Sequence, residues 1–135
     1  MGRAKDYEAR ALALVGTRFR PQGRGEGALD CLGLMLAVYG IPAGAVRRDY
    51  RLRGDYGAEI AAGITTHFRK IAAKAVLAGD ALLFKVADNQ FHFAVRTTRG
   101  CVHADAGIGR VVEMPGLPTW ALVGAYRRRQ RARRA

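Results

Sequence analysis

Apolar positions recur at helical spacing twice within the first 40 residues. In the stretch 4–15 they form one stripe, and Gly16 follows where helices often end in a left-handed residue. A second apolar run begins at Cys31 and stops at Gly40. The pattern therefore predicts a helix over residues 4–15 and a short, buried helix from Cys31, joined by a charged, Gly-rich loop.

A third apolar set follows Thr65 and Thr66. Its members have the spacing i, i+3, i+4, i+7, and they are Phe68, Ile71, Ala72 and Ala75. This spacing predicts a third helix. The preceding stretch, residues 43–65, is basic and Gly-rich, has little periodicity and contains no motif that indicates a role.

After Gly79 and Asp80 the pattern changes to short β-type runs separated by turn residues. The five runs are A-L-L-F-K-V, F-H-F-A-V-R-T, C-V-H-A-D, R-V-V-E-M and A-L-V-G-A-Y-R. Helices first and strands second are typical of an α+β domain. We therefore expect N-terminal helices packed on a C-terminal antiparallel β-meander of about five strands.

The charge balance adds a basic tail to this picture. The chain has 135 residues and a net charge of +12, from 23 basic and 11 acidic side chains. Much of the excess lies in R-R-R-Q-R-A-R-R-A, so we expect one domain over residues 1–126 and a disordered tail over 127–135. Such a charge attracts polyanions, but no aromatic residues alternate with these arginines and no DNA-binding motif spacing occurs, which argues against specific nucleic-acid recognition.

Hydropathy and cysteine usage indicate where the protein is made. The longest apolar run, from Cys31 to Val38, is much shorter than the roughly 20 residues of a transmembrane helix. The first residues lack the apolar segment and cleavage site of a secretory signal, so we expect synthesis without a signal peptide. Two cysteines are too few for a disulfide framework, and both are expected to be thiols.

Cys31 has a position that can make a thiol reactive. Asp30 precedes the second helix as its N-cap, which makes Cys31 the first helical residue. The positive end of the helix dipole stabilises a thiolate there, whereas the Asp30 charge opposes it, so activation needs an imidazole partner.

Two histidines are candidates for that partner. His92 lies between Phe91 and Phe93, so strand alternation turns it to the opposite face. His103 lies on the next predicted strand, and pairing as a hairpin would let one imidazole orient the other, as in a catalytic triad.

Other interpretations of these residues remain open. A helix cysteine is often a small buried hydrophobe, and a strand histidine is often a hydrogen-bonded core or surface residue; we assign His67 such a structural role. Cys101 and His103 share a strand face and could bind zinc together with Cys31 and His92, but the usual C-x-x-C pair is missing. We therefore expect neither a metal nor another cofactor.

The sequence resembles the NlpC-type cell-wall cysteine peptidases, which are papain-like hydrolases. Four blocks match in order: G-T-R-F-R at 16–20, D-C-L-G-L at 30–34, G-D-A-L-L-F at 79–84, and F-H-F-A-V followed by V-H-A. They resemble the family's G-T-P-Y block, D-C-S-G-L nucleophile motif, G-D-L-x-x-F strand, and H-V-G-I and I-H-A pair. The resemblance implies a papain-like NlpC-type fold.

The resemblance also implies the roles of the site residues. Cys31 would be the nucleophile, His92 the general base, and His103 the residue that orients His92. The reaction would hydrolyse peptidoglycan stem peptides through a thioester, typically at the γ-D-glutamyl bond, with the backbone N–H of Cys31 as an oxyanion-hole donor.

Three further positions are the expected substrate contacts. Asp30 matches the aspartate that engages the free amine of the stem peptide. Phe19 replaces the family tyrosine and Leu32 replaces the serine after the nucleophile, so two hydroxyl groups are absent from the cleft.

The short D-C-L-G-L variant and small size are most similar to peptidases of phage tails and gene transfer agents. Such a protein would be made in the bacterial cytoplasm, bind tail-tip or baseplate proteins and act in the cell envelope. A structural tail-tip protein that has lost activity and an amidase or acyltransferase on the same scaffold are the competing hypotheses.

Overall fold

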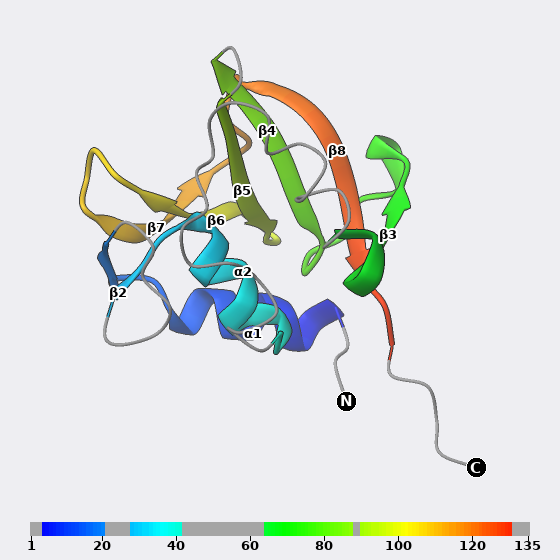
Figure 1. Cartoon of the computed structure of the whole chain (residues 1–135), viewed down its shortest axis with the longest axis horizontal. Coiled ribbons are helices and arrows are strands. Elements are labelled where there is room, and N and C mark those ends of the chain that lie inside the picture. Colours follow the sequence, from blue (N-terminus) through cyan, green and yellow to red (C-terminus); the bar gives the residue numbers. More distant parts are fainter. Residues whose placement is uncertain (1–3, 21–27, 42–63, 88–89, 131–135) are drawn as a thin grey trace.

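The computed structural model describes residues 4–20, 28–41, 64–87 and 90–130. The elements in these ranges are α1 (Ala4–Ala13), β1 (Arg18–Phe19), β2 (Ala28–Leu29), α2 (Cys31–Tyr39), β3 (Phe68–Ile71), the 3-10 turn η2 (Ala73–Ala75), β4 (Ala81–Ala87), β5 (Gln90–Arg96), β6 (Gly100–Asp105), β7 (Arg110–Pro115) and β8 (Ala121–Arg128) (Figure 1). The segment 43–65 lies largely outside the described residues. None of the described helices is long and apolar enough to cross a bilayer.

The strands form one sheet in the order β2-β1-β7-β6-β5-β4-β8-β3. Neighbouring strands pair antiparallel, except for the parallel pair β1 and β2. The helices α1 and α2 contact each other and lie on one side of the sheet (Figure 1). The predicted α+β arrangement is confirmed, as are all five expected strands. The count of five is wrong, because β1, β2 and β3 extend the sheet at its two edges.

The helix α2 begins and ends where the sequence predicted. The Asp30 side chain accepts a hydrogen bond from the Gly33 N–H at 2.7 Å, which satisfies one of the free donors of the first turn. Gly40 has φ 67°, and its N–H donates to the carbonyl of Leu36. These caps allow a nine-residue helix to hold its first residue, Cys31, in a fixed position at the sheet.

Two apolar clusters pack on the sheet. The helix-side core contains residues of α1 and α2 together with Leu83 of β4 and Phe93 of β5. The outer cluster consists of Leu82, Phe84, Ala94, Cys101 and Ala125. Because Leu82 and Phe84 alternate with Leu83 along β4, the outer cluster lies on the opposite face of the sheet.

The predicted third helix is wrong. Residues 64–67 are helical, but the chain then enters strand β3, in which Phe68 stands opposite Arg128 of β8. Phe68 packs in the helix-side core, whereas Ile71 packs against the outer cluster. Residues i and i+3 point to opposite sides of a strand, so the helical spacing of these apolar positions does not place them on one face.

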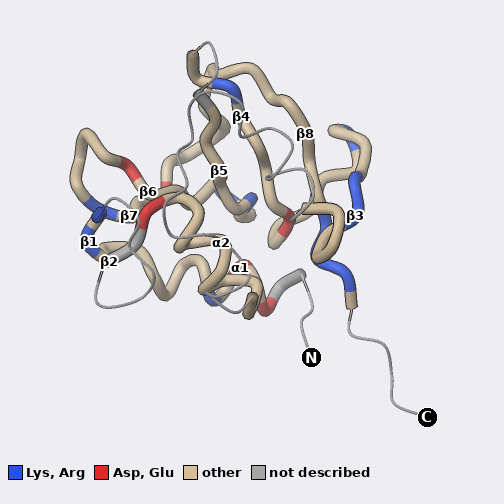
Figure 2. The backbone as a smooth tube through the Cα atoms, in the orientation of Figure 1, with Lys and Arg blue, Asp and Glu red and all other residues tan. Residues whose placement is uncertain are grey.

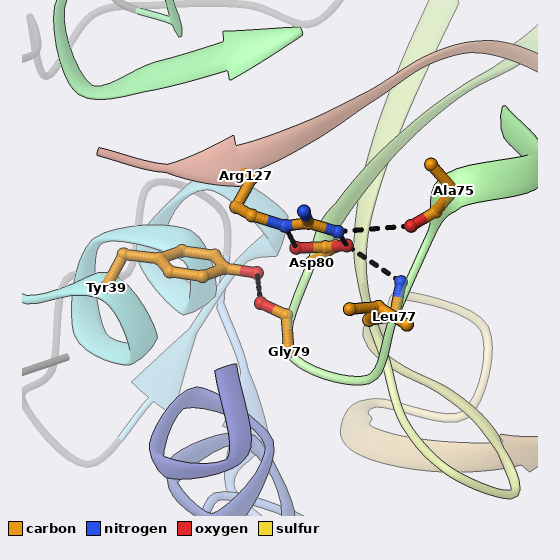
Figure 3. Close-up of polar contacts among 6 residues, drawn as sticks. All are labelled: Tyr39, Ala75, Leu77, Gly79, Asp80 and Arg127. Atoms are coloured by element: carbon orange, nitrogen blue, oxygen red, sulfur yellow. Dashed lines mark hydrogen bonds and ion pairs between the residues drawn. The ribbon is translucent and has the colours of Figure 1, made fainter. Parts of the chain in front are cut away.

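An ion pair joins Asp80, the residue before β4, to Arg127 near the C-terminal end of β8. The buried carboxylate of Asp80 accepts hydrogen bonds from Nε and Nη2 of Arg127, at 2.9 and 2.8 Å, and from the N–H of Leu77 at 2.8 Å (Figure 3). Beside it, the Tyr39 hydroxyl donates to the carbonyl of Gly79, which links α2 to the same corner (Figure 3).

The expected domain boundary after residue 126 is set too early. Strand β8 continues to Arg128, whose guanidinium donates to the carbonyls of Tyr39 and His67. The N–H of Arg129 also donates to the carbonyl of His67. The start of the expected tail is therefore part of the folded domain, and residues 131–135 lie outside the described residues.

Basic residues occur along β3 and at the end of β8 (Figure 2). Arg69 of β3 stands directly opposite Arg127 of β8. Like charges placed opposite each other destabilise a sheet. The ion pair with the Asp80 carboxylate offsets the charge of Arg127.

Candidate active site

Strands β5 and β6 bring two imidazoles together. The two strands pair antiparallel, with Val95 opposite Val102, which confirms the predicted hairpin. Nε2 of His92 lies 3.0 Å from Nδ1 of His103, a hydrogen-bonding distance. The structure therefore places one histidine where it can orient the other.

The orientation of His92 follows from alternation along β5. Phe93 is part of the helix-side core and Phe91 packs against it. His92 turns to the other side, as the sequence predicted, where its ring meets those of His103 and Trp120.

The hydrogen bond between His92 and His103 also restricts where the protons of the two imidazole rings can be. If His92 is to accept a proton at Nδ1, its Nε2 must carry hydrogen and donate to the unprotonated Nδ1 of His103. His103 then carries its proton on Nε2. This pair of tautomers leaves His92 with an unprotonated, basic nitrogen at Nδ1.

Cys31 lies beside the same strand, but its thiol is not ionised. Only 3% of its surface is exposed, and burial raises the pKa of the thiol to about 12. A backbone hydrogen bond from Phe93 lowers that pKa and the charge of Asp30 raises it, both by less than burial does. In the described part of the chain no hydrogen bond joins the thiol to either imidazole, so burial outweighs the thiolate-stabilising effect expected at a helix N-terminus.

The two imidazoles are neutral at pH 7. Burial, then the neighbouring His103, lowers the pKa of His92 to about 4, against an opposing effect of Asp105. Burial also lowers the pKa of His103, which Asp105 again opposes. The resting site thus combines a protonated thiol with two uncharged imidazoles.

Trp120 is a site residue that the sequence reasoning missed. Its ring packs edge-on against His92 and His103, with centroid distances of 5.4 and 5.8 Å, and against Phe84 at 6.0 Å. It is the one tryptophan in the chain, but it lies between Pro118 and the last strand, where no spacing connects it with the histidines. Its residue type was the only available signal.

The three expected substrate-contact residues lie around the start of α2. Asp30 is buried, and one carboxylate oxygen caps the helix. Phe19 of β1 and Leu32 of α2 are half-buried and both pack against the helix-side core. Their roles toward a substrate stay predictions.

The zinc alternative finds no support in the described residues. Cys101 is fully buried in the outer cluster, whereas Cys31 belongs to the helix-side core. Among the residues that the structure describes, no group of three or more His, Cys, Asp or Glu side chains could hold a metal ion.

Comparison with known proteins identifies the fold. No family profile matches the sequence, and no curated protein matches it. Among solved structures, NlpC1 from Trichomonas vaginalis superposes with a TM-score of 0.66 at 16% identity, over 90% of this chain and 42% of that one. NlpC2 from the same organism gives 0.66 at 19% identity, over 93% and 47%. A P60 domain of an antigen from M. avium subspecies paratuberculosis gives 0.56 at 19% identity, over 91% of each chain.

These likenesses establish an NlpC/P60-type fold. The chain spans less than half the length of each of the two Trichomonas proteins, and nearly the whole of the P60 domain. The NlpC-type fold expected from the sequence is therefore the one observed.

Proposed function

We propose that the protein is a cysteine peptidase that hydrolyses peptidoglycan stem peptides. The observation that carries the proposal is the geometry of β5 and α2. The Cys31 thiol contacts the backbone of Phe93, the residue after His92, and His92 is hydrogen-bonded to His103. The NlpC/P60-type fold supports the same activity.

In the first half of the proposed reaction, Nδ1 of His92 takes the proton of the Cys31 thiol as sulfur attacks the carbonyl carbon. The Cys31 side chain must turn from the Phe93 backbone toward the imidazole for this transfer. The backbone N–H of Cys31, at the start of α2, stabilises the oxyanion. His92 then gives its proton to the leaving amine, which leaves a thioester on Cys31.

In the second half, water hydrolyses the thioester. Neutral His92 removes a proton from the attacking water, and the imidazolium returns that proton to the leaving sulfur, which restores the thiol and releases a carboxylate. His103 holds Nε2 of His92 in place through both halves by accepting its hydrogen bond.

The proposal also names the peptide bond that is cut and the place where the protein acts. We propose cleavage at the γ-D-glutamyl bond, with Asp30 near the free amine of the stem peptide and Phe19 and Leu32 forming apolar walls where related enzymes have hydroxyls. We also propose a phage- or gene-transfer-agent tail as the site of action, with tail-tip proteins as partners. The sequence resemblance supports both.

One observation favours a second candidate, a structural protein with little or no activity. The Cys31 thiol is buried, and its raised pKa of about 12 leaves almost no thiolate at neutral pH. A nucleophile that is never ionised before substrate binds must be activated wholly within the complex. If that does not happen, the same fold would serve only as a part of a tail.

The deciding experiment compares the wild-type protein with Cys31→Ala and Cys101→Ala. Each is incubated with purified peptidoglycan and with soluble stem-peptide fragments, and products are identified by mass spectrometry. Cys101→Ala is the matched control, since it removes the other buried thiol from the outer cluster. Cleavage after D-glutamate by wild type and Cys101→Ala, and its loss in Cys31→Ala, supports the proposal. Folded wild-type protein that cleaves no substrate favours the structural candidate.

A further inference from the structure

We propose that Trp120 is a positioning residue for this reaction: its indole fixes the planes of the His92 and His103 rings and keeps water from the hydrogen bond between them. The inference rests on the proposed function, since the histidine pair acts in catalysis only if Cys31 is the nucleophile.

The geometry shows one side chain in contact with both imidazoles. The indole is inclined by 78° to the ring of His92 and by 86° to that of His103, and the two imidazoles are inclined by 84° to each other. Three mutually near-perpendicular rings are therefore packed edge to face, an arrangement that aromatic rings favour. Phe84 contacts the indole from β4 and holds it against the pair.

A hydrogen bond alone does not fix an imidazole. The terminal torsion of histidine is broad and roughly two-fold, so a ring held at one nitrogen can still rotate about that bond. Rotation of His92 about its Nε2 contact would change the direction in which Nδ1 points. Packing of the indole against both rings removes this freedom, which is the kind of preorganisation that a general base requires.

Trp120 also contributes an uncharged cover. The charged or titratable groups that act on the pair are the two imidazoles themselves and Asp105 at the end of β6. Cys31 and Asp30 stand at the start of α2. The indole adds no charge to this set. It is 37% exposed and so stands at the surface, where we infer that it covers the histidine pair from solvent. Without it, water would compete for Nε2 of His92 and stabilise a charged imidazole.

The test uses the small number of histidines. The chain has three, so NMR can follow each ring separately, and His67 serves as an internal reference outside the site. In Trp120→Leu we expect the pKa values of His92 and His103 to rise toward the ordinary value while that of His67 stays constant. Trp120→Phe, which keeps a ring, is expected to stay close to wild type. Val123→Ala, at an exposed apolar position of β8, is the matched control and should change nothing.

Kinetics then separate positioning from binding. With a stem-peptide fragment as substrate, we expect Trp120→Leu to lower kcat by about 10- to 100-fold with little change in KM, the size of effect that misplacing a catalytic group produces. Unchanged titrations and unchanged kcat in a folded Trp120→Leu protein would overturn the inference.

A measurement on the wild-type protein keeps the test decisive if Trp120→Leu does not fold. We expect nuclear Overhauser contacts from the indole to both imidazoles and a slowly exchanging Nε2 proton on His92. Rapid exchange of that proton would contradict the shielding role. An active wild type with an unaffected Trp120→Leu refutes only the role of Trp120, whereas an inactive wild type refutes the peptidase as well.

Discussion

Replacing Arg127 by leucine should be among the most destabilising changes on the surface of this protein. Asp80 has 1% of its side chain exposed and Arg127 27%, and two of the three hydrogen bonds on the carboxylate come from the guanidinium. Removing one partner of a buried ion pair costs about 3–5 kcal/mol, because the other charge stays buried without compensation. The partial exposure of Arg127 lets water reach the carboxylate once the guanidinium is gone, so we expect the lower end, about 3 kcal/mol.

Urea denaturation followed by circular dichroism measures this loss directly. For 135 residues, about 3 kcal/mol corresponds to a fall in Tm of roughly 10 °C, since unfolding entropy is about 2.1 cal/mol/K per residue. Arg69→Leu is the matched control: it removes the same charge from the exposed residue opposite Arg127 and should cost less than about 0.5 kcal/mol. In the double variant Asp80→Leu with Arg127→Leu, part of the loss should be recovered, because no charge is left buried. A cost below about 1 kcal/mol for Arg127→Leu would refute the reasoning.

Three further predictions follow from the site and the sheet. Because burial raises the thiol pKa of Cys31 to about 12 and that of Cys101 to about 11, both should react with iodoacetamide at pH 7.5 at least about 100-fold more slowly in the folded than in the urea-unfolded protein; fast alkylation of Cys31 would mean that the resting thiol is ionised. The lowered pKa of His92, about 4 in the fold against 6.5, means that the unfolded chain binds the proton first as the pH falls, so stability should decline from about pH 6.5 downwards. Urea midpoints at pH 7, 6 and 5 should show a shallower decline for His92→Gln, and equal slopes would contradict this assignment. A methyl group at Gly100 would overlap the backbone of the adjoining strand β7, so Gly100→Ala should lower the unfolding free energy by about 2–4 kcal/mol, against less than about 1 kcal/mol for Gly107→Ala in the turn before β7; similar costs would show that β7 can move away.

The parts of the fold that the sequence predicted well are those with local signals. The helix α2 has an N-cap at Asp30 and a left-handed Gly40 within ten residues of each other, and both signals act on the adjacent backbone. Strands β4 to β8 carry β-type runs bounded by turn residues. Local chemistry decides such elements, so one sequence is sufficient to find them.

The features that the sequence failed to predict depend on contacts between residues far apart in the chain. Strand β3 exists because β8 pairs with it, and Phe68 is buried there by contact with Tyr39 of α2. The helical spacing between Phe68 and Ile71 is a coincidence, because in the sheet the two side chains lie on opposite faces. Trp120 meets the histidines because β8 pairs with β4 and β4 with β5, a relation that no spacing along the chain expresses.

The thiol of Cys31 illustrates a different limit. The sequence shows the opposing influences on its ionisation, a helix N-terminus and the Asp30 carboxylate, but not the degree of burial. Burial is the largest effect, and it depends on how closely α2 packs against β5. The sequence therefore names candidate residues, whereas their resting protonation state depends on packing that it does not show.

The position of β8 has a consequence for how the protein is made. This strand, residues 121–128, is inserted between β4 and β3, both of which are synthesised earlier. Among the described strands β3 pairs with β8 alone, so during translation it has no partner until β8 has left the ribosome, and one edge of β4 stays unpaired for the same period. The sheet thus closes late in synthesis, after long-range pairing that is slow and exposes unpaired edges to other nascent chains. Pulse-labelled chains arrested before residue 121 should accordingly be protease-sensitive and bound by chaperones, and should become resistant once β8 emerges.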